Sequence, residues 1–281
     1  MKPLAITCDL YGTLLDVETN EEDLQAWTKF SFWLRLVGIW RDAEGLREAY
    51  KDWFSRLEEA MKKDGNQWPE PDVRDVLALT IGLDRKANEA LIQESAYVLR
   101  SLTTERLSVR EGVSDALLSL PYPKALVSNA QAAFSYAEMR SAGLASLFKF
   151  YVFSSDLGAR KPDALLFRVA LHRFGLEGQE SMTVHVGDSY ETDVVGAKAA
   201  GMKAVLVVPR GTIQLPSEGP RPDAVISPWD PKKLASTIEG LRDQFRHSFL
   251  EGCYLGRVSL LPSRRTFNVG FKKKDRFFGF V

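Results

Sequence analysis

The sequence lacks the features that mark a secreted, zinc-clustered or membrane-spanning protein. Its only two cysteines, Cys8 and Cys253, lie far apart, so neither a disulfide framework nor a zinc cluster is indicated. Basic and acidic residues number 37 each, which leaves no net field to attract nucleic acid or an anionic membrane. No apolar run approaches the ~18 residues that predict a membrane span. A charged ligand must therefore be met by a local site.

The amino-terminal residues carry no recognisable targeting signal. Met1, Lys2 and Pro3 lead directly into an apolar segment that ends at an aspartate. They lack the basic, apolar and small-residue zones of a secretory signal. We therefore expect a cytoplasmic protein that does not engage a membrane.

Short apolar runs rich in β-branched residues recur along the chain, and each ends in polar residues or glycine. Helical patterns separate most of them, and this alternation predicts an α/β fold with a Rossmann-like parallel sheet and helices on both faces. In such sheets ligands bind beyond the carboxyl ends of the strands. The predicted strands are Leu4 to Cys8, Ala125 to Ser128, Tyr151 to Phe153, Thr183 to Val186 and Ala204 to Val208.

A stretch of about a hundred residues without a strand signal separates the first two predicted strands. We predict that it is helical throughout, with helical spacing of apolar residues from Leu46 to Met61 and from Ala87 to Leu99. Five of the six tryptophans lie in it, and we expect them to form the core of a small helical bundle. Apolar residues on more than one face would suit a homodimer contact as well. These tryptophans are Trp27, Trp33, Trp40, Trp53 and Trp68.

The composition changes again in residues 242–281, where basic clusters alternate with phenylalanines. Basic residues interleaved with aromatic ones can bind nucleic acid. Because the rest of the chain carries no supporting basic surface, we expect a poorly ordered or edge-pairing tail and no nucleic-acid partner.

Four short segments place reactive side chains beyond the ends of predicted strands. The hydroxyl of Ser128 can donate a hydrogen bond to an oxyanion beside Asp9, and the amine of Lys161 can neutralise negative charge there. Two further carboxylates beside Asp9 would repel one another unless a cation lies among them, and oxygen ligands of this kind suit Mg²⁺. The segments are Asp9-Leu10-Tyr11-Gly12-Thr13-Leu14, Ala125-Leu126-Val127-Ser128-Asn129, Lys161-Pro162-Asp163 and His185-Val186-Gly187-Asp188-Ser189-Tyr190-Glu191-Thr192-Asp193.

Some other polar residues are expected to have no role in the chemistry. His185 lies inside a predicted strand, where a buried imidazole with hydrogen-bond partners is expected. Arg35, Arg41 and Arg47 could each reach a ligand from the helical insertion. Without geometry to place them there, we expect all three on solvated helix faces.

In this order, and with a helical insertion after the first, the four segments resemble the motifs of haloacid dehalogenase-like hydrolases over roughly residues 4 to 240. The resemblance implies an α/β core formed by residues 1–15 and 108–241. It also implies that residues 16–107 form a helical cap that closes over the site and selects the substrate. Residues 242–281 would be a separate basic and aromatic tail.

The resemblance further implies covalent catalysis, in which Asp9 attacks the substrate and forms an aspartyl ester that water hydrolyses. Thr13 and Ser128 would hydrogen-bond the transferred group, and Lys161 would balance its negative charge. Ser128, Asn129 and Lys161 would bind the substrate. In a phosphatase of this family, Mg²⁺ would bind the Asp9 carboxylate, the backbone carbonyl of Tyr11 and the Asp188 carboxylate, with support from Asp193.

Two positions point to different reactions. Most phosphatases of the family carry a second aspartate as general acid and base where this chain has Tyr11, and this first segment resembles that of 2-haloacid dehalogenases, whose leaving halide needs no proton. Those dehalogenases, however, generally have a small polar residue in place of Asp188 and a tyrosine in place of Phe167. We therefore expect a Mg²⁺-dependent phosphatase of a small phosphorylated metabolite. The alternatives are a metal-independent 2-haloacid dehalogenase and a non-catalytic binding protein.

Overall fold

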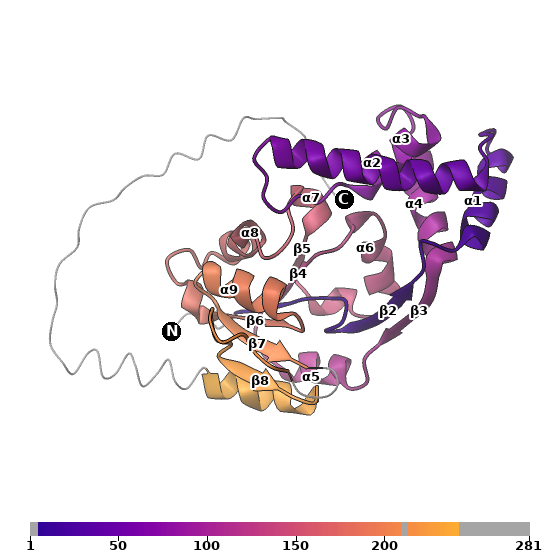
Figure 1. The fold of residues 1–281 in the computed structure, drawn as a ribbon. Helices are drawn as coiled ribbons and strands as arrows, with labels where there is room; N and C mark the ends of the chain where they lie inside the picture. Colours follow the sequence, from indigo (N-terminus) through magenta and orange to yellow (C-terminus); the bar gives the residue numbers. More distant parts are fainter. Residues whose placement is uncertain (1–4, 209–212, 242–281) are drawn as a thin grey trace, which may run out of the picture. The chain divides into compact units, whose positions relative to one another are not determined.

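The computed structural model describes residues 5–208 and 213–241, which are drawn in colour in Figure 1. The predicted tail, residues 242–281, lies outside the described residues. Within the described residues, every helix is too short or too polar to cross a membrane.

A six-stranded parallel sheet forms the core, with the strand order β5-β4-β1-β6-β7-β8. All five predicted strands are confirmed. The additional strand β8 has only three residues, which is too short to give a strand signal in the sequence. The strands are β1 (Ala5–Cys8), β4 (Lys124–Ser128), β5 (Phe150–Phe153), β6 (Thr183–Gly187), β7 (Lys203–Val207) and β8 (Ala224–Ile226).

The central strand β1 lies between β4 and β6, and this arrangement positions the site. Cys8, the last residue of β1, pairs with Leu126 of β4 and with Val186 of β6. From β1 the chain continues to β4 and β5 on one side, and it then returns to β6 on the other. Such a reversal of strand order opens a crevice at the carboxyl ends of the strands.

Helices cover both faces of this sheet (Figure 1). Phe167 of α8 and Ala197 of α9 are fully buried against Val127 of β4 and Leu206 of β7. The α5 helix lies on the opposite side of the sheet. The core helices are α5 (Val113–Ser119), α6 (Ala132–Ser141), α7 (Ser154–Leu157), α8 (Ala164–Phe174) and α9 (Val195–Ala199), with the short turns η1 (Ala145–Leu147), η2 (Glu180–Met182) and η3 (Tyr190–Val194).

Four helices lie between the first and second strands of the large sheet. Three of them begin at an aspartate, and the side chains of Asp23, Asp42 and Asp72 each accept a hydrogen bond from a backbone N–H of the first turn. Leucine, isoleucine and valine side chains from all four helices form one apolar core around Trp27 and Phe30. The helices are α1 (Leu24–Leu36), α2 (Ala43–Lys63), α3 (Val73–Ile81) and α4 (Glu89–Thr103).

The prediction that this insertion is helical throughout was wrong at both of its ends. Strands β2 (Leu15–Thr19) and β3 (Thr104–Val109) form an antiparallel ribbon between the sheet and the helices (Figure 1). The ribbon buries few side chains, so its strands carry little of the apolar alternation that reveals a strand. The two strands pair along their backbones, and the exposed ion pair Arg106–Glu18, at 2.6 Å, also crosses between them. The predicted cap boundaries, residues 16 and 107, fall inside these strands.

The prediction of a tryptophan core is confirmed for Trp27 and wrong for Trp40 and Trp68. Trp27 is fully buried, whereas Trp40 is 71% exposed and Trp68 is 36% exposed. Trp33 and Trp53 are partly buried. Leucine, isoleucine and valine side chains fill most of the space around Trp27, and Trp33 packs against this core from a partly buried position.

We expect Trp27→Ala to lower the free energy of unfolding by about 3–5 kcal/mol, because it leaves a large cavity in a packed core. The side chain packs on the rings of Phe30 and Tyr50, and its Nε1 donates to the Glu21 carbonyl at 2.7 Å. Urea unfolding followed by circular dichroism measures the loss. The matched control Trp40→Ala removes an exposed indole and should cost less than about 1 kcal/mol. Equal losses would contradict the placement of Trp27 in this core.

Candidate active site

The strand order brings three predicted segments to one edge of the sheet. Asp9 follows β1, and its backbone N–H donates to the carbonyl of Val186 in β6 at 2.9 Å. Ser128 ends β4, and Asp188 follows β6. Since β4 and β6 flank β1, these side chains meet at the carboxyl end of the central strand.

A cavity of about 240 Å³ opens at this point. All the side chains predicted to form the site line it except Thr13, whose hydroxyl is turned toward Asp188. Two residues of the turn after β6, Ser189 and Thr192, join them. The full lining is Asp9, Tyr11, Ser128, Asn129, Lys161, Asp188, Ser189, Thr192 and Asp193.

The ammonium group of Lys161 lies at the centre of the polar contacts. Its Nζ donates to Asp9 Oδ1 and Asp193 Oδ1, each at 2.5 Å, and to the Val127 carbonyl at 3.1 Å. The side chain is only 1% exposed. Burial alone would lower the pKa of Lys161, but the charges of Asp193 and Asp9 outweigh it and raise that pKa above its usual value. The group is therefore a buried ammonium.

Asp193 is held in one orientation by its neighbours. Its Oδ1 lies 3.1 Å from His185 Nε2, and its Oδ2 accepts the backbone N–H of Ser189 at 3.0 Å. A Cβ atom at Gly187 would come within 2.2 Å of Asp193 Cγ, so glycine is required there. Burial opposes the charge on Asp193, but Lys161 and His185 hold its pKa well below the usual range. With both oxygens used, Asp193 supports the site more readily than it binds a metal directly.

His185 is confirmed as a buried imidazole with partners at both nitrogens. Its Nδ1 lies 2.9 Å from Thr7 Oγ1, and its Nε2 faces Asp193. Burial lowers the pKa of His185, so the ring stays neutral near pH 7. It orients Asp193 from behind and does not line the cavity.

Asp188 is positioned by two residues of the segment that follows β1, Thr13 and Gly12. Thr13 Oγ1 donates to Asp188 Oδ1 at 3.0 Å. Gly12 has a φ of +81°, and a Cβ there would lie 2.3 Å from Asp188 Oδ2, so only glycine permits this approach. Burial, together with the charges of Asp9 and Asp193, raises the pKa of Asp188 to about 6.

The carboxylate cluster fits a divalent cation, for which Asp9 and Asp188 are better placed as direct ligands than Asp193. Asp9, Asp188 and Asp193 each offer an oxygen, and these atoms lie within 4.8 Å of one another. The Lys161 ammonium lies between Asp9 and Asp193, and burial together with the neighbouring negative charges raises the pKa of Asp188. An all-oxygen set of this kind suits Mg²⁺.

Ser128 presents an unused donor to the cavity. The residue is 1% exposed, and its Oγ has no hydrogen-bond partner in the part of the chain that the structure describes. A buried hydroxyl without a partner is costly, and this one is available to donate to a ligand oxygen.

The side chain of Asn129, unlike that of Ser128, already has hydrogen-bond partners. Its Oδ1 accepts the Lys161 N–H at 2.7 Å, and its Nδ2 donates to the Lys161 carbonyl at 3.2 Å. Both ends of the amide thus hold the backbone of Lys161. Its binding to substrate stays a prediction.

Tyr11 is one of the residues that line the cavity, but its hydroxyl is bonded to residues outside the lining. The O–H donates to Glu138 of α6 in a short hydrogen bond and lies 2.8 Å from Ser135 Oγ. Glu138 also accepts from Arg100 Nε of α4 at 2.7 Å, and that guanidinium lies 5.6 Å from the centre of the Tyr11 ring. Burial and the Glu138 charge raise the pKa of Tyr11 above its usual value. The hydroxyl is therefore a weak acid bonded away from Asp9.

The model of the haloacid dehalogenase-like hydrolase family matches residues 4–201 of this chain. The chain belongs to this family. A phosphoserine phosphatase of Thermus thermophilus is 40% identical over 83 residues, which span 30% of this chain and 32% of that protein. The match thus spans about a third of that relative. An uncharacterized protein of Saccharomyces cerevisiae is 25% identical over 73% of this chain and 72% of its own length.

Solved structures of the family share the fold. A 2-haloacid dehalogenase from Pseudomonas syringae pv. Tomato has a TM-score of 0.60 and 25% identity, covering 85% of this chain and 99% of its own. A phosphatase of the family from Thermococcus onnurineus has a TM-score of 0.50 and 23% identity, covering 83% and 97%. A 2-haloacid dehalogenase and a phosphatase therefore share the fold of this hydrolase.

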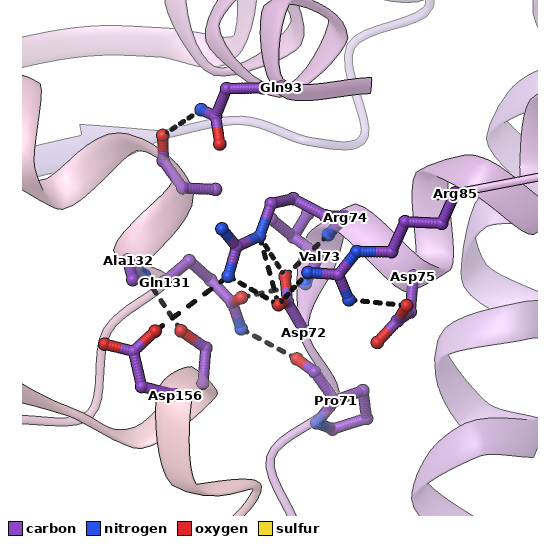
Figure 2. A network of polar contacts seen from close by, with 12 residues as sticks. Pro71, Asp72, Val73, Arg74, Asp75, Arg85, Gln93, Gln131, Ala132 and Asp156 are labelled. Carbon is purple, nitrogen blue, oxygen red and sulfur yellow. Dashed lines mark hydrogen bonds and ion pairs between the residues drawn. The ribbon is translucent and has the colours of Figure 1, made fainter. Parts of the chain in front are cut away.

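The helical insertion of this hydrolase is bonded to the loop that follows β4. Figure 2 shows Gln131 reaching into the turn before α3, where its Oε1 accepts the Val73 N–H at 2.9 Å and its Nε2 donates to the Pro71 carbonyl at 3.0 Å. Nearby, Arg74 lies 2.7 Å from Asp72 and 3.9 Å from Asp156 of α7. Since Gln131 follows Asn129 by two residues, these contacts support the loop that holds Lys161.

The same turn, residues 66–73, also contacts the loop that carries Lys161. Asn66 Nδ2 donates to the Gly158 carbonyl at 2.7 Å. The Arg160 N–H donates to the Trp68 carbonyl at 2.7 Å, and the Glu70 N–H donates to the Gly158 carbonyl at 3.1 Å. Two loops of the site are thus tied to one turn of the insertion.

The arginines named from the sequence do not line the cavity around Asp9, and Arg100, which sequence reasoning missed, contacts the ring of Tyr11. Arg35 and Arg41 are exposed. Glu138 and Ser135 were missed as well. Their spacing places both on one face of a helix, but the partner of that face is 127 residues distant from Glu138 in the chain, and no local pattern marks it.

We expect Gln131→Ala to lower the free energy of unfolding by about 1–3 kcal/mol, because it leaves partly buried backbone groups of the insertion without partners. Its matched control is Gln25→Ala at an exposed position of α1, which should change stability by less than about 0.5 kcal/mol. Urea unfolding of the two variants measures the difference. Indistinguishable midpoints would show that the contacts in Figure 2 do not hold the insertion to the loop.

Proposed function

We propose that this hydrolase is a Mg²⁺-dependent phosphatase of a small phosphorylated metabolite, with Asp9 as the nucleophile. The observation that carries the proposal is the cluster of Asp9, Asp188 and Asp193 around a cavity of about 240 Å³. A metal-independent enzyme would have to place an anionic substrate against three carboxylates and a single ammonium. With a divalent cation bound, the same cluster attracts a phosphate dianion.

The residues of the site divide the chemistry among them. The Asp9 carboxylate attacks phosphorus to form an aspartyl phosphate, which water then hydrolyses. The free hydroxyl of Ser128 donates to a phosphoryl oxygen, and Lys161 balances the charge that accumulates beside Asp9. Mg²⁺ held by Asp9, the Tyr11 carbonyl and Asp188 would add Lewis-acid stabilisation of the phosphoryl group.

Relatives named as phosphatases support this direction. Besides the Thermus protein, a glyceraldehyde 3-phosphate phosphatase of Methanothermobacter thermautotrophicus is 33% identical over 91 residues, or 32% of this chain. Both act on small phosphorylated metabolites by their names, and we extend that substrate class to this hydrolase.

Release of para-nitrophenol from para-nitrophenyl phosphate tests the proposal. We expect turnover with Mg²⁺, loss of turnover with EDTA, and loss of turnover in Asp9→Asn, which removes the nucleophile. Asp188→Asn should raise the Mg²⁺ concentration for half-maximal rate by about 10-fold or more. Asp52→Asn, at an exposed position of α2, is the matched control and should retain the rate and the metal dependence. Turnover that persists in EDTA would contradict the metal site.

A second candidate, 2-haloacid dehalogenase, is favoured by one observation. The Tyr11 hydroxyl is bonded to Glu138 and not directed at Asp9, and a departing halide needs no proton donor. The dehalogenase of Pseudomonas syringae also has the same fold at 25% identity.

Chloride release from 2-chloropropionate separates the two reactions. We expect no release above background, because the carboxylate cluster opposes an anionic substrate when no metal is bound. Release in EDTA that disappears in Asp9→Asn would reverse the order of the two candidates. A folded protein that is inert in both assays would instead indicate a non-catalytic binding protein.

A further inference from the structure

We infer that the substrate of the proposed phosphatase carries a leaving group that departs as a stable anion, as the carboxylate of an acyl phosphate does. The inference rests on the proposed function and narrows it. It is carried by the position of the Tyr11 hydroxyl and by the hydrogen bonds of the side chains around Asp9.

Tyr11 follows Asp9 by two residues and lines the cavity, but its hydroxyl is not available as a proton donor. The hydroxyl proton is committed to Glu138, whose other oxygen is bonded to Arg100. Neither Glu138 nor Ser135 lines the cavity around Asp9. Turning the hydroxyl into the cavity would leave the largely buried Glu138 with one partner fewer.

Among the described residues that line the cavity, the charged and acidic groups do not replace the Tyr11 hydroxyl as a proton donor. Lys161 uses all three of its protons on Asp9, Asp193 and the Val127 carbonyl, and these contacts favour its charged form. Asp193 accepts hydrogen bonds at both of its oxygens, and Asp188 belongs to the carboxylate cluster that would bind the metal.

The remaining lining residues are not acids of useful strength. Ser128, Ser189 and Thr192 carry aliphatic hydroxyls, and the amide of Asn129 is bonded to the Lys161 backbone. No general acid is therefore directed at the leaving oxygen from this lining.

The chemical consequence follows from the balance of the first step. The Asp9 oxygen forms a bond to phosphorus as the bond from phosphorus to the leaving oxygen breaks, so the leaving group takes that electron pair and departs as an anion. Water then attacks the aspartyl phosphate, which releases dihydrogen phosphate and restores the Asp9 carboxylate. General acid assistance typically accelerates such a departure by ~10²–10⁴-fold. Without it an alkoxide leaves slowly, whereas a carboxylate or an acidic phenolate leaves readily.

The full-length protein with Mg²⁺ tests the inference through a series of leaving groups. We expect kcat/KM for acetyl phosphate to exceed that for glycerol 1-phosphate by ~10²-fold or more. A series of substituted phenyl phosphates should give rates that rise steeply as the phenol becomes more acidic. Asp9→Asn defines the background for each compound.

Two variants test the part played by position 11. Tyr11→Asp places a carboxyl group beside the leaving oxygen, and it should narrow the gap between acetyl phosphate and glycerol 1-phosphate by ~10-fold or more. Tyr11→Phe removes only the hydroxyl and should keep the steep dependence of the wild-type protein, whatever its absolute rate. Thermal unfolding establishes that both variants are folded, and the wild-type series is decisive without them.

The outcomes are distinct. Comparable Asp9-dependent rates for glycerol 1-phosphate and acetyl phosphate would overturn the inference while leaving the phosphatase function intact. A dependence that becomes steeper in Tyr11→Phe would identify the hydroxyl as an acid and also overturn it. Absence of Asp9-dependent phosphate release from every compound would overturn the proposed function together with the inference.

Discussion

The ammonium group of Lys161, buried between Asp9 and Asp193, is the interaction on which the rest of the site depends. An isolated ammonium in such a place would be neutralised, because burial strongly disfavours its charge. Two carboxylates at 2.5 Å keep it charged, and Gly187 leaves the room that this arrangement needs. Lys161 and Asp193 are each bonded on several sides, and Lys161 in turn holds Asp9 Oδ1 before any substrate binds.

The helical insertion is part of that arrangement. The turn formed by residues 66–73 contacts the loop before Lys161 and the loop after Ser128, and Asn129 joins these two loops through the Lys161 backbone. The insertion therefore helps to position charged groups of the site through its contacts with these loops. Arg100 adds a contact with the ring of Tyr11, the residue in which the site departs most from the usual phosphatase pattern.

Much of the architecture could be read from the sequence because its signals are local. Each core strand is a short apolar run that ends in a polar residue, and parallel strands must present those residues at one edge of the sheet. The ribbon of β2 and β3 was not predicted because it buries few side chains. The burial of the tryptophans was predicted only in part, because the size of a side chain alone does not decide which residues fill a helical core. Apolar periodicity predicts strands and helices that bury one face, and it gives no signal for an element whose side chains are mostly exposed.

The sequence by itself determined that Asp9, Ser128 and Asp188 would lie at the ends of strands, because each strand is a short apolar run that ends in polar residues. Only the tertiary structure decided what each group does there. It left the Ser128 hydroxyl free, committed Asn129 to the Lys161 backbone and turned the Tyr11 hydroxyl to Glu138. The physical reason is distance along the chain: a hydrogen bond between residues 127 positions apart leaves no trace in local pattern, and the fold alone creates it.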